Sequence, residues 1–211
     1  MQFETLKQKT GNLLFLTKQD LKVLEPDKHN LDANIKYWFK NNELTKIKNG
    51  FYLITEKYQN EDNKTYYLEY LANQIVKPSY LSGEYVLSQY NLLTEAVYVM
   101  TSVTTKVTRE INNKLADFKY YSINSNLFFG FVIKKFNHAF ILEAIQEKAL
   151  FDFLYFRFFK NNLISLEDLK NLRINWENIS RKKFLKSKKY FDLSNNQNMK
   201  KIYNLILQNF L

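Results

Sequence analysis

Residues 44–54 constrain the fold of this chain more than any other segment. Two short runs of aliphatic and aromatic residues flank the dipeptide Asn49-Gly50, and Asn-Gly between such runs is the strongest local signal for a β-hairpin. Lys46 and Lys48 do not alternate strictly with the apolar residues, as a strand with one buried face requires. The segment therefore predicts a hairpin whose register is open.

The residues before this hairpin predict three short helices. The first ends near Gly11. Thr17 is placed to cap the second helix, because its hydroxyl can accept a hydrogen bond from a backbone N–H of the first turn. A proline-containing turn at residues 25–29 separates this helix from the third, which Asn30 is placed to cap.

The third predicted helix is amphipathic. Leu31, Ile35 and Trp38 recur at the spacing of one helical face, and polar residues fill most other positions up to Lys40. One face of such a helix is buried, and the opposite face is exposed and available to a partner. The order helix, helix, turn, helix and hairpin is that of a winged helix-turn-helix, which we predict for residues 1–58.

The remaining residues predict a mixed α/β domain, so the fold class is α+β. Polar residues 59–64 predict a linker to a second domain at 65–211, with a sheet-containing core at 65–160 and a basic helical tail at 161–211. The core is expected to hold a small sheet and a buried central helix near 145–159. The other predicted elements are helices near 66–76 and 82–90, the latter capped by Ser82, strands near 97–101, 118–123 and 129–133, and tail helices near 165–172, 176–190 and 197–210.

The net charge of +10 suggests a polyanionic partner, although lysine-rich chains from A/T-rich genomes are often basic for codon reasons alone. The charge is largest in the tail, which carries +6, against +3 for residues 1–58. Basic residues are dense enough between 181 and 189 to contact a phosphate backbone, and a solvated helix face is the alternative. They are Arg181, Lys182, Lys183, Lys186, Lys188 and Lys189.

Composition excludes several classes of enzyme. The absence of cysteine excludes a disulfide framework, a thiolate zinc site and a cysteine nucleophile. The four glycines are isolated, so neither a dinucleotide-binding fingerprint nor a Walker phosphate loop can form. His29 and His138 are the only histidines and lie far apart in the sequence. We therefore predict no catalytic residue, no cofactor and no metal ion.

One pattern keeps an enzyme reading open. Asp117-Phe118-Lys119 places a carboxylate and a lysine two residues apart on a predicted strand, as a magnesium-dependent nuclease would need. The alternative is a solvated strand face. The sequence also predicts no membrane span and no secretory signal, because charged residues interrupt every apolar run, and its lack of cysteine fits the reducing cytoplasm.

The helix-turn-helix prediction assigns contacts to DNA by position. The third helix would enter the major groove, where the Asn34 amide could bond adenine and Lys36 and Lys40 could meet guanine or phosphate. The other predicted DNA-binding residues are Thr17, Lys18 and Gln19 at the start of the second helix, Asn30 and Tyr37 in the third, and Lys46, Lys48 and Asn49 in the hairpin. A module that binds protein or RNA is the alternative, because many winged helices bind protein.

Four segments together resemble the AbiEi family of antitoxins from type IV toxin–antitoxin systems in bacterial phage-defence (abortive infection) loci. They are the hairpin ending in Gly50-Phe51-Tyr52, residues 77–82 (KPSYLS), the strand near 97–101, and residues 147–152 (EKALFD). The resemblance covers about residues 12 to 158. It implies a cytoplasmic repressor that binds repeats in its own promoter through the N-terminal module. It also implies that the C-terminal domain opposes a partner nucleotidyltransferase toxin, usually without a stable complex.

Overall fold

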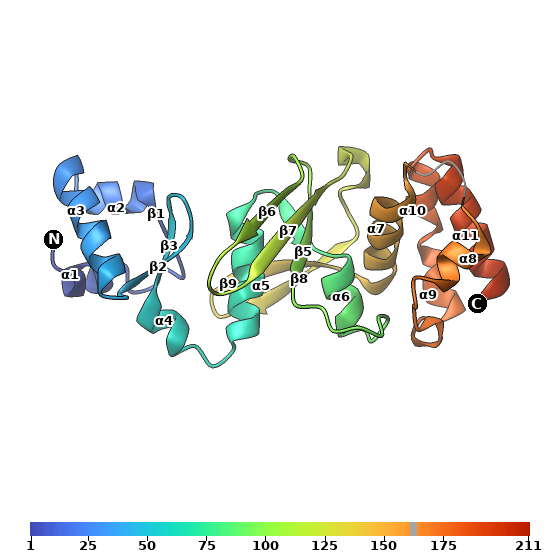
Figure 1. Cartoon of the computed structure of the whole chain (residues 1–211), viewed down its shortest axis with the longest axis horizontal. Coiled ribbons are helices and arrows are strands. Elements are labelled where there is room, and N and C mark those ends of the chain that lie inside the picture. The colour runs from blue at the N-terminus through green and yellow to red at the C-terminus, as the bar shows by residue number, and fades with distance from the viewer. Residues whose placement is uncertain (161–163) are drawn as a thin grey trace. The chain divides into compact units, whose positions relative to one another are not determined.

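The computed structural model describes residues 1–160 and 164–211 and divides into two compact units (Figure 1). The first unit holds residues 1–71 and 111–116, and the second holds residues 72–110 and 117–211. The boundary between the units along the chain therefore falls within the helix α5 (Lys64–Ile75). The sequence had predicted a linker at 59–64 instead. The first three residues of the expected tail lie outside the described residues.

The first unit contains three helices and a three-stranded antiparallel sheet of order β1-β3-β2, followed by a short fourth helix. Strand β1 is only two residues long, and its pairing with β3 had no signal in the sequence. The helix α3 and the hairpin were predicted and are present. The elements are α1 (Phe3–Lys9), β1 (Leu16–Thr17), α2 (Lys18–Leu24), α3 (Lys28–Lys40), β2 (Leu44–Lys48), β3 (Phe51–Ile54) and α4 (Thr55–Gln59).

A β-bulge explains the imperfect alternation in the hairpin. Lys46 pairs with Tyr52 and Lys48 with Phe51, so one extra residue, Ile47, stands in β2. Ile47 is buried at 2% exposure, while Lys46 is exposed. The bulge therefore places the Ile47 side chain in the core between two lysines. It also breaks the strict alternation of buried and exposed residues in β2.

The core of the first unit forms where α3 packs on the other helices and the sheet. Leu31, Ile35 and Trp38 are all buried, which confirms the predicted apolar stripe. Each such side chain stabilises the fold by about 1.5–3 kcal/mol relative to an exposed one. The surrounding cluster also contains Leu6, Leu16, Leu21, Leu44, Tyr52 and Ile54.

The caps of α2 and α3 differ in how well the sequence predicted them. Thr17 caps α2 as expected, and its hydroxyl and backbone form a capping box with Asp20. The prediction that Asn30 caps α3 was wrong. Asp27 is the cap, because its carboxylate accepts the Asn30 backbone N–H at 2.7 Å and the helix begins at Lys28. Asn30 is therefore the third residue of the helix.

The second unit is built on a six-stranded mixed sheet of order β6-β7-β5-β4-β9-β8. Pairs β4·β5 and β8·β9 are antiparallel, and β4·β9 and β5·β7 are parallel. Together with the helices of both units, this confirms the α+β class. The strands are β4 (Ser79–Leu81), β5 (Met100–Thr104), β6 (Arg109–Asn112), β7 (Asp117–Ser122), β8 (Phe131–Phe136) and β9 (Ala139–Ala144).

Several expectations for this unit need correction. Strands β4, β6 and β9 were not predicted, and β5 begins three residues later than expected. The cap of α6 (Glu84–Gln89) is Gly83 at a φ of 64°, and the Ser82 hydroxyl donates to Asp152 instead. Gly83 leaves no side chain between the β4 end and the helix, and Ser82 is fully buried. Ser82 is therefore one residue before the cap position of α6, and its hydroxyl serves the buried Asp152 carboxylate.

The helix α7 (Gln146–Phe158) lies between the sheet and the C-terminal helices (Figure 1), as expected of a buried central helix. All but two of its residues are buried. The tail forms shorter pieces than predicted, because the expected helix at 176–190 is divided around Ser180 and Ser187. The pieces are α8 (Leu166–Lys170), the 3-10 turn η2 (Trp176–Asn178), α9 (Arg181–Lys186), α10 (Lys188–Leu193) and α11 (Gln197–Asn209). No helix in the described part of the chain is both long and apolar enough to cross a bilayer.

Candidate nucleic-acid interface

The side of α3 opposite its buried stripe is exposed over almost four turns. Lys36 and Lys40 lie on this side, as predicted, and Tyr37 is 61% exposed. At 3.6 residues per turn, Ala33 and Lys40 lie at its centre. The sequence predicted an exposed or phosphate-facing His29 in a turn, and His29 is exposed but belongs to α3. Ala33 was missed, although it could have been found as a position opposite the apolar stripe. The exposed residues are His29, Asn30, Ala33, Lys36, Tyr37 and Lys40.

The Asp32 carboxylate beside this side of α3 is paired. Asp32 accepts a hydrogen bond from the Lys18 ammonium at 2.9 Å, and both side chains are about 40% exposed. This bond holds the pKa of Asp32 below its usual value, and the nearby charges of Lys28 and Lys36 act in the same direction. The local charge is therefore positive at Lys36 and Lys40. Lys18, which was predicted to bind phosphate, already has an anionic partner in Asp32.

The hairpin turn is attached to the beginning of α2. The Lys18 backbone N–H donates to the Gly50 carbonyl at 2.9 Å, and Gly50 takes a φ of 74° that favours glycine. Of the predicted hairpin contacts, Lys46 and Asn49 are exposed, and the half-buried Lys48 ammonium lies 5.8 Å from the Phe51 ring centroid. The hairpin and the first turn of α2 thus lie side by side within the first unit.

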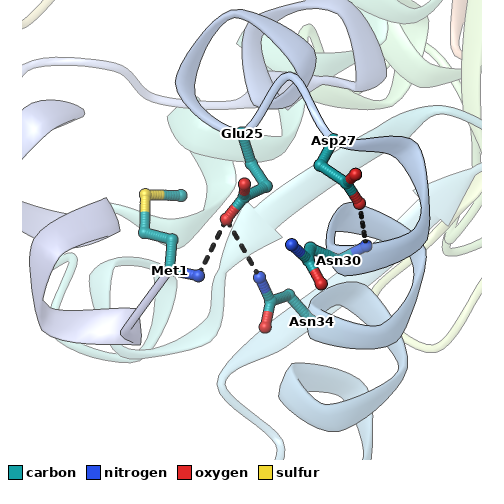
Figure 2. Close-up of polar contacts among 5 residues, drawn as sticks. All are labelled: Met1, Glu25, Asp27, Asn30 and Asn34. Carbon is teal, nitrogen blue, oxygen red and sulfur yellow. Dashed lines mark hydrogen bonds and ion pairs between the residues drawn. The ribbon is translucent and has the colours of Figure 1, made fainter.

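Asn34 lies away from the exposed side of α3. It is half-buried, and its amide donates to the Glu25 carboxylate at 3.5 Å (Figure 2). The same Glu25 oxygen accepts the amino group of Met1 at 2.8 Å. Asn34 neighbours the buried stripe because it stands three residues after Leu31 and four before Trp38. The adenine contact expected of Asn34 does not fit this position.

The two remaining predicted residues of α2 have different surroundings. The Thr17 hydroxyl donates to the Asp20 carboxylate at 2.7 Å and accepts the Asp20 backbone N–H, so it serves the helix cap. Gln19 is exposed. Of these two residues, Thr17 uses its side chain in the helix cap, and Gln19 has a side chain that takes no part in it.

The C-terminal basic residues are all exposed but do not form one helix face. They are divided between α9 and α10 at the buried Ser187. Most have a partner within the second unit. Lys183 donates to Gln146, Arg181 to the Leu207 carbonyl, Lys188 pairs with Asp192, and Lys189 lies over the rings of Phe129 and Tyr190. Lys182 and Lys186 are the two with no such contact in the described residues.

A buried polar cluster joins two of the segments that carry the family resemblance. The Lys148 ammonium pairs with Asp152 at 2.6 Å, and the other Asp152 oxygen accepts from the Ser82 hydroxyl at 2.7 Å and the Tyr80 hydroxyl at 3.0 Å. All four residues have 0% exposure. Burial raises the pKa of Asp152 and lowers that of Lys148, while their contact opposes both shifts. Because this cluster is sealed from solvent, it cannot meet a substrate and acts in the fold.

The residues of the nuclease pattern lie on an exposed part of the sheet. Asp117 is exposed on β7, and the half-buried Lys119 pairs with Glu110 at 2.7 Å. No group of three or more possible metal-binding side chains occurs among residues 1–160 and 164–211. Within the described residues, Lys119 is thus engaged by Glu110 and Asp117 is exposed on the strand.

Comparison with protein-family models and with curated proteins gives no match to this chain.

Proposed function

We propose that the first unit is a winged helix-turn-helix that binds double-stranded DNA, with α3 in the major groove and the β2–β3 hairpin as the wing. The observation that carries this proposal is the exposed side of α3. It presents Lys36 and Lys40, contains no acidic residue, and is opposite a fully buried stripe. A helix of this kind fits the major groove, and its lysines can neutralise phosphates along the rim.

The hairpin supports the same proposal. Its turn is bonded to the beginning of α2, so its exposed Lys46 and Asn49 have a fixed place beside the helices. In winged helices, such a turn contacts the backbone or the minor groove next to the site read by the helix. The short strand β1, which pairs with β3, completes the small sheet that this fold uses.

We further propose that the chain is a cytoplasmic transcriptional repressor and antitoxin, as the resemblance to AbiEi proteins implies. In this proposal the first unit represses the chain's own promoter, and the second unit opposes a nucleotidyltransferase toxin. Two of the resembling segments contribute the buried residues Tyr80, Ser82, Lys148 and Asp152, which gives those segments a structural reason to occur together.

The test is binding of the full chain to fluorescent duplex DNA from the region upstream of its gene, measured by anisotropy at several salt concentrations. Replacing Lys36 and Lys40 by alanine removes two phosphate contacts. The slope of log affinity against log salt should then become shallower by about 1.8, from about 0.9 per contact. The matched control is Lys9→Ala, an exposed lysine of α1. Equal affinity of the double variant and the wild type would refute the assigned face.

A second candidate function is a module that binds RNA or protein through the C-terminal basic residues. The observation in its favour is that Lys182 and Lys186 are exposed and have no partner among the described residues. Replacing both by alanine should then weaken binding to duplex RNA more than the Lys36 and Lys40 substitutions do. The opposite order supports the DNA-binding proposal.

A further inference from the structure

We propose that Asn30 is the residue of α3 that reads adenine, and that Ala33 and Tyr37 contact the methyl groups of neighbouring thymines. The first unit would then prefer A·T pairs at the centre of its site. This inference rests on the proposed DNA binding and adds to it the base preference of the same surface. Three features of α3 support it, namely an amide available for hydrogen bonding, the shape of the exposed side and the charges around it.

The first feature is the availability of an amide. An asparagine recognises adenine in a bidentate contact, in which its amide NH2 donates to N7 and its amide oxygen accepts from the N6 amino group, so both amide groups must be available. The Asn34 amide is turned to Glu25 and is half-buried (Figure 2). Asn30 is exposed, and Asp27 engages only its backbone N–H. In the described part of the chain the Asn30 side-chain amide makes no hydrogen bond, so it is the amide of α3 that can meet a base.

The second feature is the shape of the surface around Asn30. As the third residue of α3, Asn30 lies near the helix N-terminus, which is the part of a reading helix that reaches base edges. Ala33 follows one turn later at the centre of the exposed side, and its single methyl group lets the helix backbone come close to the groove floor. Tyr37 follows another turn later and is 61% exposed. Small and aromatic side chains in this row suit the methyl group that thymine presents in the major groove.

The third feature is the absence of groups that favour G·C pairs. Carboxylates accept from cytosine, but Asp27 is committed to the cap of α3 and Asp32 to Lys18. Arginine is the most frequent reader of guanine, and the chain contains none before Arg109. On the same exposed side, Lys36 lies about 120° around the helix from Asn30 and Lys40 nearly three turns along it, where their ammonium groups can reach phosphate. Asn30, Ala33 and Tyr37 are therefore the residues that we expect to contact A·T pairs.

The experiment is selection of binding sites by the purified full chain from a random duplex library, followed by affinity measurements on the selected duplex. The wild type should select a position occupied by adenine. Asn30→Ala should lose about 5- to 150-fold of the discrimination at that position, while Asn34→Ala should keep it. Asn30→Gln retains the amide and should retain a preference for adenine. Circular dichroism of each variant checks that the helices are intact.

Modified bases test the thymine contacts. Replacing the selected thymines by uracil removes their methyl groups and should weaken binding of the wild type. The same replacement should have a smaller effect on Ala33→Gly, because that variant lacks the contacting methyl group. Sequence-specific binding with an unchanged adenine preference in Asn30→Ala would overturn this inference and leave DNA binding intact. Failure of the wild type to bind any duplex, even at low salt, would overturn the proposed function as well.

Discussion

The buried pair of Lys148 and Asp152 allows a quantitative prediction about the second unit. Removing one member leaves the other as a buried, unpaired charge, which costs about 3–5 kcal/mol. Removing both and filling the space with apolar side chains is often close to neutral. We therefore expect Lys148→Met and Asp152→Leu each to be strongly destabilising alone, and the double variant to be more stable than Asp152→Leu, because only the unpaired hydroxyls of Tyr80 and Ser82 then remain.

The contacts also predict the order of the two single variants. Without Lys148, the carboxylate still accepts from Tyr80 and Ser82 and can take up a proton, because burial raises its pKa. Without Asp152, the ammonium keeps its contacts with the rings of Tyr80, Phe151 and Tyr190 but loses its anionic partner, and two buried hydroxyls lose their acceptor. Asp152→Leu should thus fall near about 5 kcal/mol and Lys148→Met near about 3 kcal/mol.

The assay must report on the second unit alone. Each unit holds one tryptophan, Trp38 in the first and Trp176 in the second, and both are buried. Urea unfolding followed by fluorescence in a Trp38→Phe background therefore measures the second unit. In thermal unfolding followed by the same fluorescence, the single variants should lower its melting temperature by roughly 6–20 °C. Lys170→Met, which replaces an exposed helical lysine, should change the unfolding free energy by no more than about 0.5 kcal/mol.

The decisive quantity is the coupling energy between the two substitutions. A double variant as unstable as the sum of the single variants would refute the reasoning, because the two charges would then act independently. Equal stability of both single variants and the parent would refute the buried ion pair itself.

Three further predictions concern other contacts. The pKa of Asp32, measured by carbon NMR titration, should lie below 3.8, and Lys18→Met should raise it. Because this pKa is depressed in the folded state, the ion pair contributes to stability above about pH 3.8, and this contribution is lost as the pH falls through the lower native pKa. Gly130→Ala should destabilise the second unit by more than about 1 kcal/mol, since Gly130 has a φ of 88° and an added Cβ would overlap the Tyr190 hydroxyl. Tyr190→Phe should relieve part of this loss and be nearly neutral alone, because that buried hydroxyl has no hydrogen-bond partner among residues 1–160 and 164–211. Asp27→Ala should cost the first unit about 0.5–2 kcal/mol in urea unfolding, whereas Asp27→Asn should cost less because an amide oxygen can also cap a helix.

Local patterns in the sequence predicted the parts of the first unit that depend on neighbouring residues. The stripe of Leu31, Ile35 and Trp38, the Thr17 cap and the Asn49-Gly50 turn all follow from spacings of a few residues. The bulge at Ile47 was visible only as a broken alternation. Strand β1 has no local signal, because two residues cannot show a period and their pairing with β3 spans more than 30 residues of sequence.

The candidate interface was predicted in outline and altered in detail. The exposure of Lys36, Tyr37 and Lys40 follows from the apolar stripe. Which asparagine is free depends on where α3 begins, and the choice of Asp27 over Asn30 as its cap could not be made from residue preferences that rank the two equally. Contacts between distant residues escape such reasoning entirely, as in the Ser82 and Asp152 pair, 70 positions apart.

The second unit was harder to predict because its strands are either short or buried. Strand β4 has three residues and follows Pro78, which reads locally as a break before a helix. All of its residues are buried, so no polar alternation marks it as a strand. Strand β9, by contrast, is identified by its pairing with β8 along six residues, which is a property of the sheet.

The bond between the Lys18 backbone and the Gly50 carbonyl has a consequence for protein engineering. A main-chain bond is indifferent to side-chain identity, so the charged residues of the hairpin can be exchanged without loosening the turn from α2. Insertions and deletions in the hairpin are a different matter, because they would draw Gly50 away from this anchor. A designer seeking new targets for this chain should therefore vary composition at positions 46, 48 and 49 and hold the number of residues constant.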